Sequence, residues 1–215
     1  MNIDWDKKKG KLIVVFGIDG SGKTTLISKL KEYYHDNGTI VFYPCIKEAK
    51  FVKEIRDAKN SMHYLKDSFS KAFSGIAHIN DIVYNVLNFI EPLLNSNVNV
   101  VLDRYSICCR VFLESGAPED YFVMSKMMSC LPVPDLGIYL DIHVEEAMSR
   151  IVKRAESNGK PLNRYDNIDA LIILKKLYSK IIQEEEYKIV TVDANNDSEY
   201  VLRESIKAIN ELLKK

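Results

Sequence analysis

The chain of 215 residues has few of the features that mark disulfide-rich, zinc-binding or nucleic-acid-coating proteins. It has only four cysteines, without CxxC spacing or a matching histidine pattern: Cys45, Cys108, Cys109 and Cys130. We therefore expect reduced thiols rather than a zinc site or a disulfide framework. An excess of charge is also absent, because 30 Lys and Arg residues balance 30 Asp and Glu residues. The overall charge thus predicts no nucleic-acid partner and no anionic membrane partner.

Long hydrophobic runs are absent as well. The apolar run nearest the start, residues 12–16, is too short for the core of a signal peptide or for a membrane span. We therefore expect a cytoplasmic protein. Its 47% of hydrophobic residues is enough for a sizeable core, and its length fits one domain over residues 1–215.

Short apolar segments alternate with segments of helical spacing along the chain. The expected strands are at 11–17, 39–44, 98–105, 136–142 and 187–194. The expected helices are at about 23–37, 47–95, 119–131, 144–157, 168–185 and 198–214. Most of the strand segments are nearly continuous apolar runs, which is typical of a parallel sheet that is buried on both faces. The alternation predicts an α/β fold with helices on both faces of the sheet.

A phosphate-binding motif comes directly after the first expected strand. Residues 17–24, with the sequence GIDGSGKT, fit the pattern GxxxxGK[ST] and lead directly into a helical segment. In such a loop, backbone N–H groups and the helix N-terminus face the phosphates, and the lysine, here Lys23, reaches the β- and γ-phosphates. The hydroxyl of Thr24 is placed to bind Mg²⁺. The motif predicts a nucleoside triphosphate site with magnesium.

Residues outside the phosphate loop indicate which class of triphosphate-binding protein this is. A guanine-reading motif should come after a strand, but the nearest candidate, residues 163–166, comes after a polar segment. ATP-driven machines need a larger core, so a small kinase remains. Asp103 ends the third expected strand, where a carboxylate can hold the hydration shell of magnesium, and Arg104 can bridge donor and acceptor phosphates. The alternative is that Asp103 caps a loop and Arg104 forms an ion pair.

In order and spacing, "GIDGSGKTT", "DRY", "PDLGIYLDI" and "NRYD" resemble the thymidylate kinase family of nucleoside monophosphate kinases over nearly the whole chain. The resemblance implies a P-loop NTPase fold of three α/β/α layers, with a five-stranded parallel sheet and a short lid at about 150–166. It also implies transfer of the γ-phosphate of ATP to dTMP, with nucleotides as small-molecule partners, and a homodimer.

The resemblance also implies roles for individual residues. Transfer would use Lys23, Asp103, Arg104, Arg150 and Arg154, with Thr24 and Asp103 at the metal. ATP would contact Gly17, Asp19, Gly20, Ser21, Gly22, Lys23, Thr24, Thr25, Arg150 and Ala194. The acceptor would contact Asp19, Pro44, Arg56, Phe73, Arg104, Tyr105 and Cys108, and Arg164 would lie at the far side of the lid. A solvated basic helix is the alternative for the lid residues, since Glu146 and Arg150 are spaced to pair on one helix face.

The acceptor site departs from the family pattern. The family usually has an arginine two residues before the proline of the second strand, but Phe42 and Tyr43 precede Pro44 here. That arginine binds the acceptor phosphate, and Arg56 and Lys47 are the nearest cations that could replace it. The family's long helix has an aromatic that stacks on thymine and an arginine four residues later, but no arginine lies between Arg56 and Arg104 here. Cys108 stands where the family commonly has serine.

Three functions remain open at this point: a dTMP kinase, a kinase of the same fold that acts on another monophosphate, modified nucleotide or small acceptor, and a non-catalytic ATP-binding homologue. A pure binder would not need Asp103, Arg104, Arg150 and Arg154 together, so the sequence favours an enzyme.

Overall fold

The computed structural model describes residues 8–36, 40–43, 54, 71–116, 121–159, 161–162 and 166–214. The described strands form one parallel sheet of five strands in the order β2-β3-β1-β4-β5. They are β1 (Leu12–Phe16), β2 (Ile40–Tyr43), β3 (Asn99–Asp103), β4 (Leu136–Asp141) and β5 (Ile189–Asp193). The five expected strands and the parallel sheet are confirmed.

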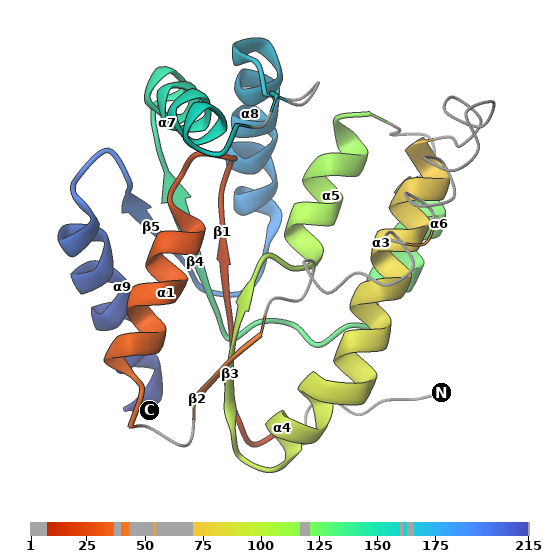
Figure 1. The fold of residues 1–215 in the computed structure, drawn as a ribbon. Coiled ribbons are helices and arrows are strands. Elements are labelled where there is room, and N and C mark those ends of the chain that lie inside the picture. The colour runs from red at the N-terminus through yellow and green to blue at the C-terminus, as the bar shows by residue number, and fades with distance from the viewer. Residues whose placement is uncertain are drawn as a thin grey trace.

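Helices cover both faces of this sheet. On one side lie α1 (Lys23–Tyr33) and α9 (Ser198–Leu213), and on the other lie α3 (Lys71–Asn85), α5 (Ser106–Glu114) and α8 (Ile168–Glu184), as Figure 1 shows. The structure also describes α4 (Glu91–Asn95), α6 (Tyr121–Met128) and α7 (Val144–Ser157). Every residue of β1 is buried, as expected for a central strand between two helix layers. The predicted three-layer α/β/α architecture is therefore confirmed.

The helix α5 was not predicted from the sequence. Its side chains are apolar around most of the helix, and five of its nine residues are buried. Nine residues are fewer than the window over which helical spacing is recognised in a sequence, so this segment gave no clear signal. Its position matters because it starts at Ser106, two residues after Arg104.

The long helical segment before β3 is interrupted where a proline enters it. A π-helical turn at Val86–Ile90 joins α3 to α4, and Pro92 lies in the first turn of α4. Proline cannot donate a backbone hydrogen bond and its ring crowds the preceding turn, so the wider turn relieves the helix.

The helix α9 shows the expected amphipathic pattern. Asp197 caps its start by accepting hydrogen bonds from the backbone N–H groups of Glu199 and Tyr200. Ile209 is buried, and Leu202 packs against the core. Among the described residues, no helix is both long enough and apolar enough to cross a membrane.

Candidate active site

The loop after β1 needs glycine at two positions for different reasons. Gly20 has φ of 81°, and a Cβ atom there would lie 2.4 Å from the carbonyl oxygen of Ala147 on α7. Gly22 has φ of 90° and caps the start of α1 in the left-handed conformation. The glycines therefore allow the loop to turn tightly into α1 and to pack directly against α7.

Lys23 is folded back over this loop. Its Nζ atom donates to the carbonyl oxygens of Gly17 at 3.0 Å and Ile18 at 2.7 Å, and to the Ser21 hydroxyl at 3.3 Å. Burial, and then the positive charge of Arg104, lower the pKa of Lys23 to about 7. The ammonium group thus lies in a site that favours an added anion.

Arg104 is placed beside the phosphate loop by the sheet. Its backbone N–H donates to the carbonyl of Val15 at 3.0 Å, and its φ of 71° turns the chain out of β3. The guanidinium donates to Oδ1 of Asp19, and Nζ of Lys23 lies 3.9 Å from the same oxygen. The two cations therefore converge on one carboxylate at the mouth of the loop.

The opposite charges of Asp19 and Arg104 counteract the effect of burial on the pKa of each group. Burial alone would raise the pKa of Asp19, but the charges of Arg104 and Lys23 outweigh it and hold that pKa below its usual value. Burial would likewise lower the pKa of Arg104, yet the carboxylate of Asp19 contributes to raising it above its usual value. Both groups are therefore charged at neutral pH.

The predicted metal-binding residues are oxygen donors at adjacent elements. Asp103 is buried at the carboxyl end of β3, where it pairs in register with Val15 of β1. Thr24 is exposed in the first turn of α1. In the part of the chain that the structure describes, no group of three or more His, Cys, Asp or Glu residues could hold a metal. A hydroxyl and one carboxylate fit Mg²⁺, which keeps several waters and takes phosphate oxygens as ligands.

A cavity of about 280 Å³ lies on the α9 side of the phosphate loop. Its walls include five residues that the sequence predicted as ATP contacts: Ser21, Gly22, Thr25, Arg150 and Ala194. Arg150 crosses this cavity, because its guanidinium donates to the carbonyl of Ala194 at 3.2 Å and to Glu146 at 2.7 Å. The structure thus brings the predicted donor-side residues together.

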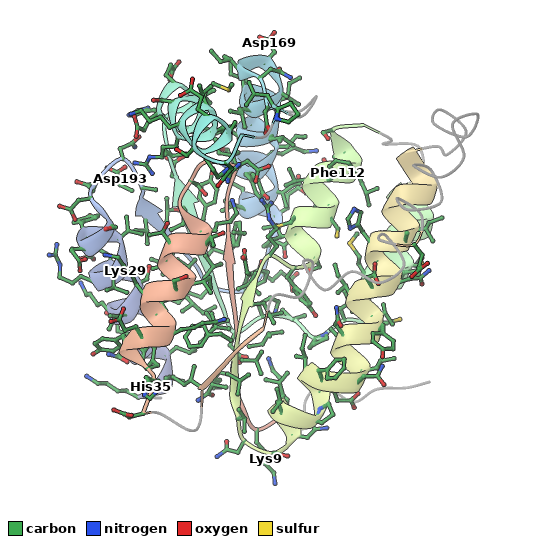
Figure 2. The ribbon with its side chains drawn as sticks, viewed as in Figure 1. Lys9, Lys29, His35, Phe112, Asp169 and Asp193 are labelled. Atoms are coloured by element: carbon green, nitrogen blue, oxygen red, sulfur yellow. The ribbon has the colours of Figure 1, made fainter. Side chains whose placement is uncertain are left out.

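The loop after β5 forms one wall of that cavity and is held by its own polar groups. Oδ1 of Asp193 accepts from the backbone N–H of Asn195 at 3.0 Å, and Oδ2 accepts from the Asn196 amide at 2.8 Å. The backbone N–H of Ala194 donates to the Asp141 carbonyl at 2.7 Å. Figure 2 shows Asp193 on the side of α9, and Phe112 on the other side of β1.

Two of the cavities beside α5 also include residues of the phosphate loop. One, of about 200 Å³, is lined by Asp19, His78, Arg104, Cys108, Cys109, Phe112 and Leu113. The second, of about 280 Å³, is lined by Gly17, Ile18, Asp19, Arg104, Cys108, Val111, Phe112, Ser115, Ala170, Ile173, Leu174 and Tyr178. Asp19 and Arg104 line both, so both cavities open onto the ion pair beside the phosphate loop.

Tyr178 of α8 lines the larger of these two cavities. It is buried, and its ring packs on those of Phe16 and Tyr139 with centroids 5.8 Å and 5.7 Å away. Burial, and then Cys108, raise the pKa of Tyr178 well above its usual value. The neutral phenol lines that cavity together with Cys108 and Arg104.

Other predicted residues have mixed placements. Arg154 is exposed on α7, and its charge contributes least among the causes that lower the pKa of Asp19. Tyr105 is buried and its hydroxyl donates to the Pro132 carbonyl, so the structure does not bring it into the two cavities. Outside the described residues lie Pro44, Lys47, Arg56, Arg164 and the side chain of Phe73.

Sequence reasoning assigned no site role to Phe112 or Tyr178, and it indicated His78 only as one of several aromatic residues of the long helical segment that could form a platform for the base. The spacing of Cys108 and Phe112 would have paired them once α5 was known, because residues four apart share one face of a helix. His78 and Tyr178 come from distant parts of the chain, and only the packing of α3 and α8 beside α5 brings them in.

The family model described as Thymidylate kinase matches residues 15–206. The chain belongs to the thymidylate kinase family. It is therefore an ATP-dependent phosphotransferase of the nucleoside monophosphate kinase type. The thymidylate kinase of Leptospira interrogans is 28% identical over 207 residues, covering 94% of this chain and 95% of the relative. That of Mycoplasma capricolum is 29% identical over 208 residues, covering 92% and 93%.

Further similarity extends to an archaeal relative and to a solved structure. The probable thymidylate kinase of Methanosarcina barkeri is 29% identical over 222 residues, covering 95% of this chain and 98% of the relative. The structure of deoxyadenosine kinase from M. mycoides, with dCMP and a flexible dCDP bound, has a TM-score of 0.65 at 18% identity. The match covers 94% of this chain and 99% of that one, and it shows the fold alone.

Proposed function

We propose that this chain transfers the γ-phosphate of ATP to the 5′-phosphate of dTMP, giving dTDP and ADP. The observation that carries the proposal is the position of Arg104. It lines both cavities beside α5 and is paired with Asp19 of the phosphate loop, close to Lys23. A cation between the donor loop and an acceptor cavity stabilises the charge that builds during phosphoryl transfer.

On the donor side, the phosphate loop would hold the triphosphate through its backbone N–H groups and Lys23. Phosphate oxygens would then replace the loop carbonyls as hydrogen-bond partners of Nζ. Arg150 would contact ATP at the cavity beside Ala194, which it already borders. Thr24 and Asp103 would hold Mg²⁺, which neutralises charge on the β- and γ-phosphates.

During the reaction, an oxygen of the acceptor phosphate forms a bond to the γ-phosphorus. The bond from that phosphorus to the bridging oxygen breaks, and ADP leaves with the electron pair. The acceptor is already an anion at neutral pH, so no general base is needed. Arg104 bridges the two anions, and Arg150 and Arg154 add positive charge. Both belong to residues 150–166, which act as a lid. In this proposal the chain forms a single domain of residues 1–215.

On the acceptor side, Asp19 would face the deoxyribose. Its oxygen acceptor and its exposure suit a sugar hydroxyl, since 45% of the side-chain surface is open. Cys108 and Phe112 would line the space occupied by the nucleoside.

A kinase of the same fold that acts on another monophosphate or small acceptor is the second candidate. It is favoured by the sequence around Pro44 and by the lack of arginine between Arg56 and Arg104. The third function that the sequence left open, a non-catalytic ATP-binding homologue, disagrees with the family match. Nothing in such a protein would require Arg104 to be shared between the phosphate loop and an acceptor cavity.

The test is a panel of acceptors with purified protein and Mg-ATP: dTMP, dUMP, dCMP, CMP, UMP, AMP and GMP. We expect ADP formation that depends on the acceptor and is greatest with dTMP. A higher rate with another monophosphate would support the second candidate. No ADP above a Lys23→Ala control with any acceptor would leave only the third. We also propose that the protein is cytoplasmic and forms a homodimer. Sedimentation of the purified chain would test the oligomeric state.

A further inference from the structure

Lys175 of α8 reaches from the helix to the carboxyl end of β4. Its Nζ atom donates to the carbonyl oxygen of Ile142 at 2.6 Å and lies 2.7 Å from Oδ1 of Asp141. Both side chains are partly buried, with 28% of Lys175 and 39% of Asp141 exposed. The ammonium group therefore holds a backbone carbonyl and a carboxylate at the point where β4 ends.

The same end of β4 is bonded to the loop that borders the donor cavity. The backbone carbonyl of Asp141 accepts from the backbone N–H of Ala194 at 2.7 Å. Ala194 lines the donor cavity, and its own carbonyl accepts from the Arg150 guanidinium at 3.2 Å. A displacement of the Asp141 backbone would thus move Ala194 and its contact with Arg150 together.

Two carboxylates meet at this edge of the sheet. Asp141 and Asp193 are paired in register at the ends of β4 and β5. Like charges on directly paired residues of neighbouring strands repel each other. The Asp193 carboxylate shapes the donor loop, because it accepts hydrogen bonds from Asn195 and Asn196. The positive charge of Lys175 compensates the Asp141 carboxylate, so that both strand ends keep their positions.

We propose that Lys175 is a positioning residue for the donor nucleotide, which acts through Asp141 and Ile142 to keep Ala194 at the wall of the donor cavity. This inference rests on the placement of ATP in that cavity under the proposed function. The phosphate loop, which would hold the triphosphate, follows a different strand, β1. The contribution of Lys175 therefore concerns the nucleoside part of ATP and not its phosphates.

The test measures binding by calorimetry, with Mg²⁺ and without acceptor, for ATP and for inorganic tripolyphosphate, which lacks the nucleoside. The full chain is compared with Lys175→Met, which removes the ammonium group, and with Lys175→Arg, which keeps a cationic donor. We expect Lys175→Met to weaken ATP binding about threefold to tenfold and tripolyphosphate binding by less than about twofold. Lys175→Arg should retain most of the ATP affinity. In steady-state kinetics, Lys175→Met should raise KM for ATP by the same factor and leave kcat at saturating ATP unchanged.

Two further variants separate positioning from a general loss of stability. In a chain that also carries Asp141→Asn, Lys175→Met should weaken ATP binding by less than about twofold, because the neutral amide has no ion pair to lose and does not repel Asp193. The matched control is Lys180→Met, on the same helix, at a lysine that pairs with Glu114 at 3.1 Å and has 59% of its side chain exposed. It should leave the binding of both ligands unchanged.

Equal weakening of ATP and tripolyphosphate binding in Lys175→Met, or no weakening of ATP binding, would overturn the inference. So would a wild-type chain that binds ATP no more tightly than tripolyphosphate. Because the binding measurement contains no acceptor, its result is independent of the choice of dTMP. A wild-type chain that phosphorylates a different monophosphate, while Lys175→Met selectively weakens ATP binding, would overturn the dTMP assignment and uphold the role of Lys175.

Discussion

Replacing Arg104 with alanine should separate catalysis from folding. The ion pair that it breaks is half-exposed, since 26% of the Arg104 side chain and 45% of the Asp19 side chain are open to solvent. Pairs at such sites contribute about 0.2 to 1 kcal/mol to stability. Asp19 also keeps Lys23 as a neighbour, at 3.9 Å. The free energy of unfolding should therefore fall by no more than about 1 kcal/mol.

The effect on the reaction should be much larger. A positioned cation that meets charge developing in the transition state is worth about 2 to 4 kcal/mol. At about 1.36 kcal/mol for each factor of ten, this predicts a loss of about 30- to 1,000-fold in kcat for Arg104→Ala. ATP affinity should change little, because the backbone of the phosphate loop and Lys23 remain.

The assay measures ADP formation at saturating ATP and acceptor, together with ATP binding and urea unfolding. The control is Arg110→Ala, which removes an arginine of α5 whose side chain is only 18% exposed and pairs with Glu114 at 3.0 Å and with Glu184. That variant should lose stability and keep kcat. Equal losses of ATP affinity and kcat in Arg104→Ala, or a loss of kcat no greater than in Arg110→Ala, would refute the assignment.

Three further predictions concern the phosphate loop and its neighbours. The pKa of Lys23 is about 7 in the free protein, and bound triphosphate favours its charged form, so ATP binding above pH 7 should take up a proton and weaken as pH rises. Calorimetry in two buffers at pH 8 would measure the proton uptake, and Lys23→Met should abolish it. Arg150→Ala should raise KM for ATP about threefold to tenfold and should also lower kcat, though by less than Arg104→Ala does. It removes a cation that borders the donor cavity and adds charge from the lid, and steady-state kinetics would measure both effects. Gly20→Ala should lower the free energy of unfolding in urea by about 3 kcal/mol, because its Cβ would collide with the Ala147 carbonyl. The control Gly159→Ala, also at positive φ but with nothing within 4 Å of the added Cβ, should lower it by about 1 kcal/mol. Similar losses in the two variants would contradict this explanation.

The sheet could be predicted because each of its strands can be recognised from a few consecutive residues. Each strand is a short apolar run bounded by polar residues, and the observed strands lie within the predicted ranges. The helix at Ser106–Glu114 could not, because its nine residues are too few for helical spacing to stand out. A buried helix and a buried strand look alike at that length.

The donor half of the site was also accessible from the sequence, since the phosphate loop is continuous and the resemblance supplied Arg150 and Ala194. The acceptor half depends on packing between helices. His78 and Phe112 are neighbours only because α3 lies against α5, and no spacing in the sequence reveals that contact. The placement of Tyr105 in the core shows the same limit, because the motif gives the position of a side chain along the chain but not the direction in which it points.

The helices α7 and α8, which precede and follow the turn at Gly159, both contact the reaction centre. Ala147 of α7 lies against Gly20 of the phosphate loop, and Tyr178 of α8 lines a cavity with Cys108 and Arg104. A Cβ atom built on Gly159 itself would meet nothing within 4 Å. An engineered insertion or a fused reporter at this turn would therefore leave both contacts in place while lengthening the proposed lid, residues 150–166, so that it would alter closure over ATP rather than the folded position of Arg104.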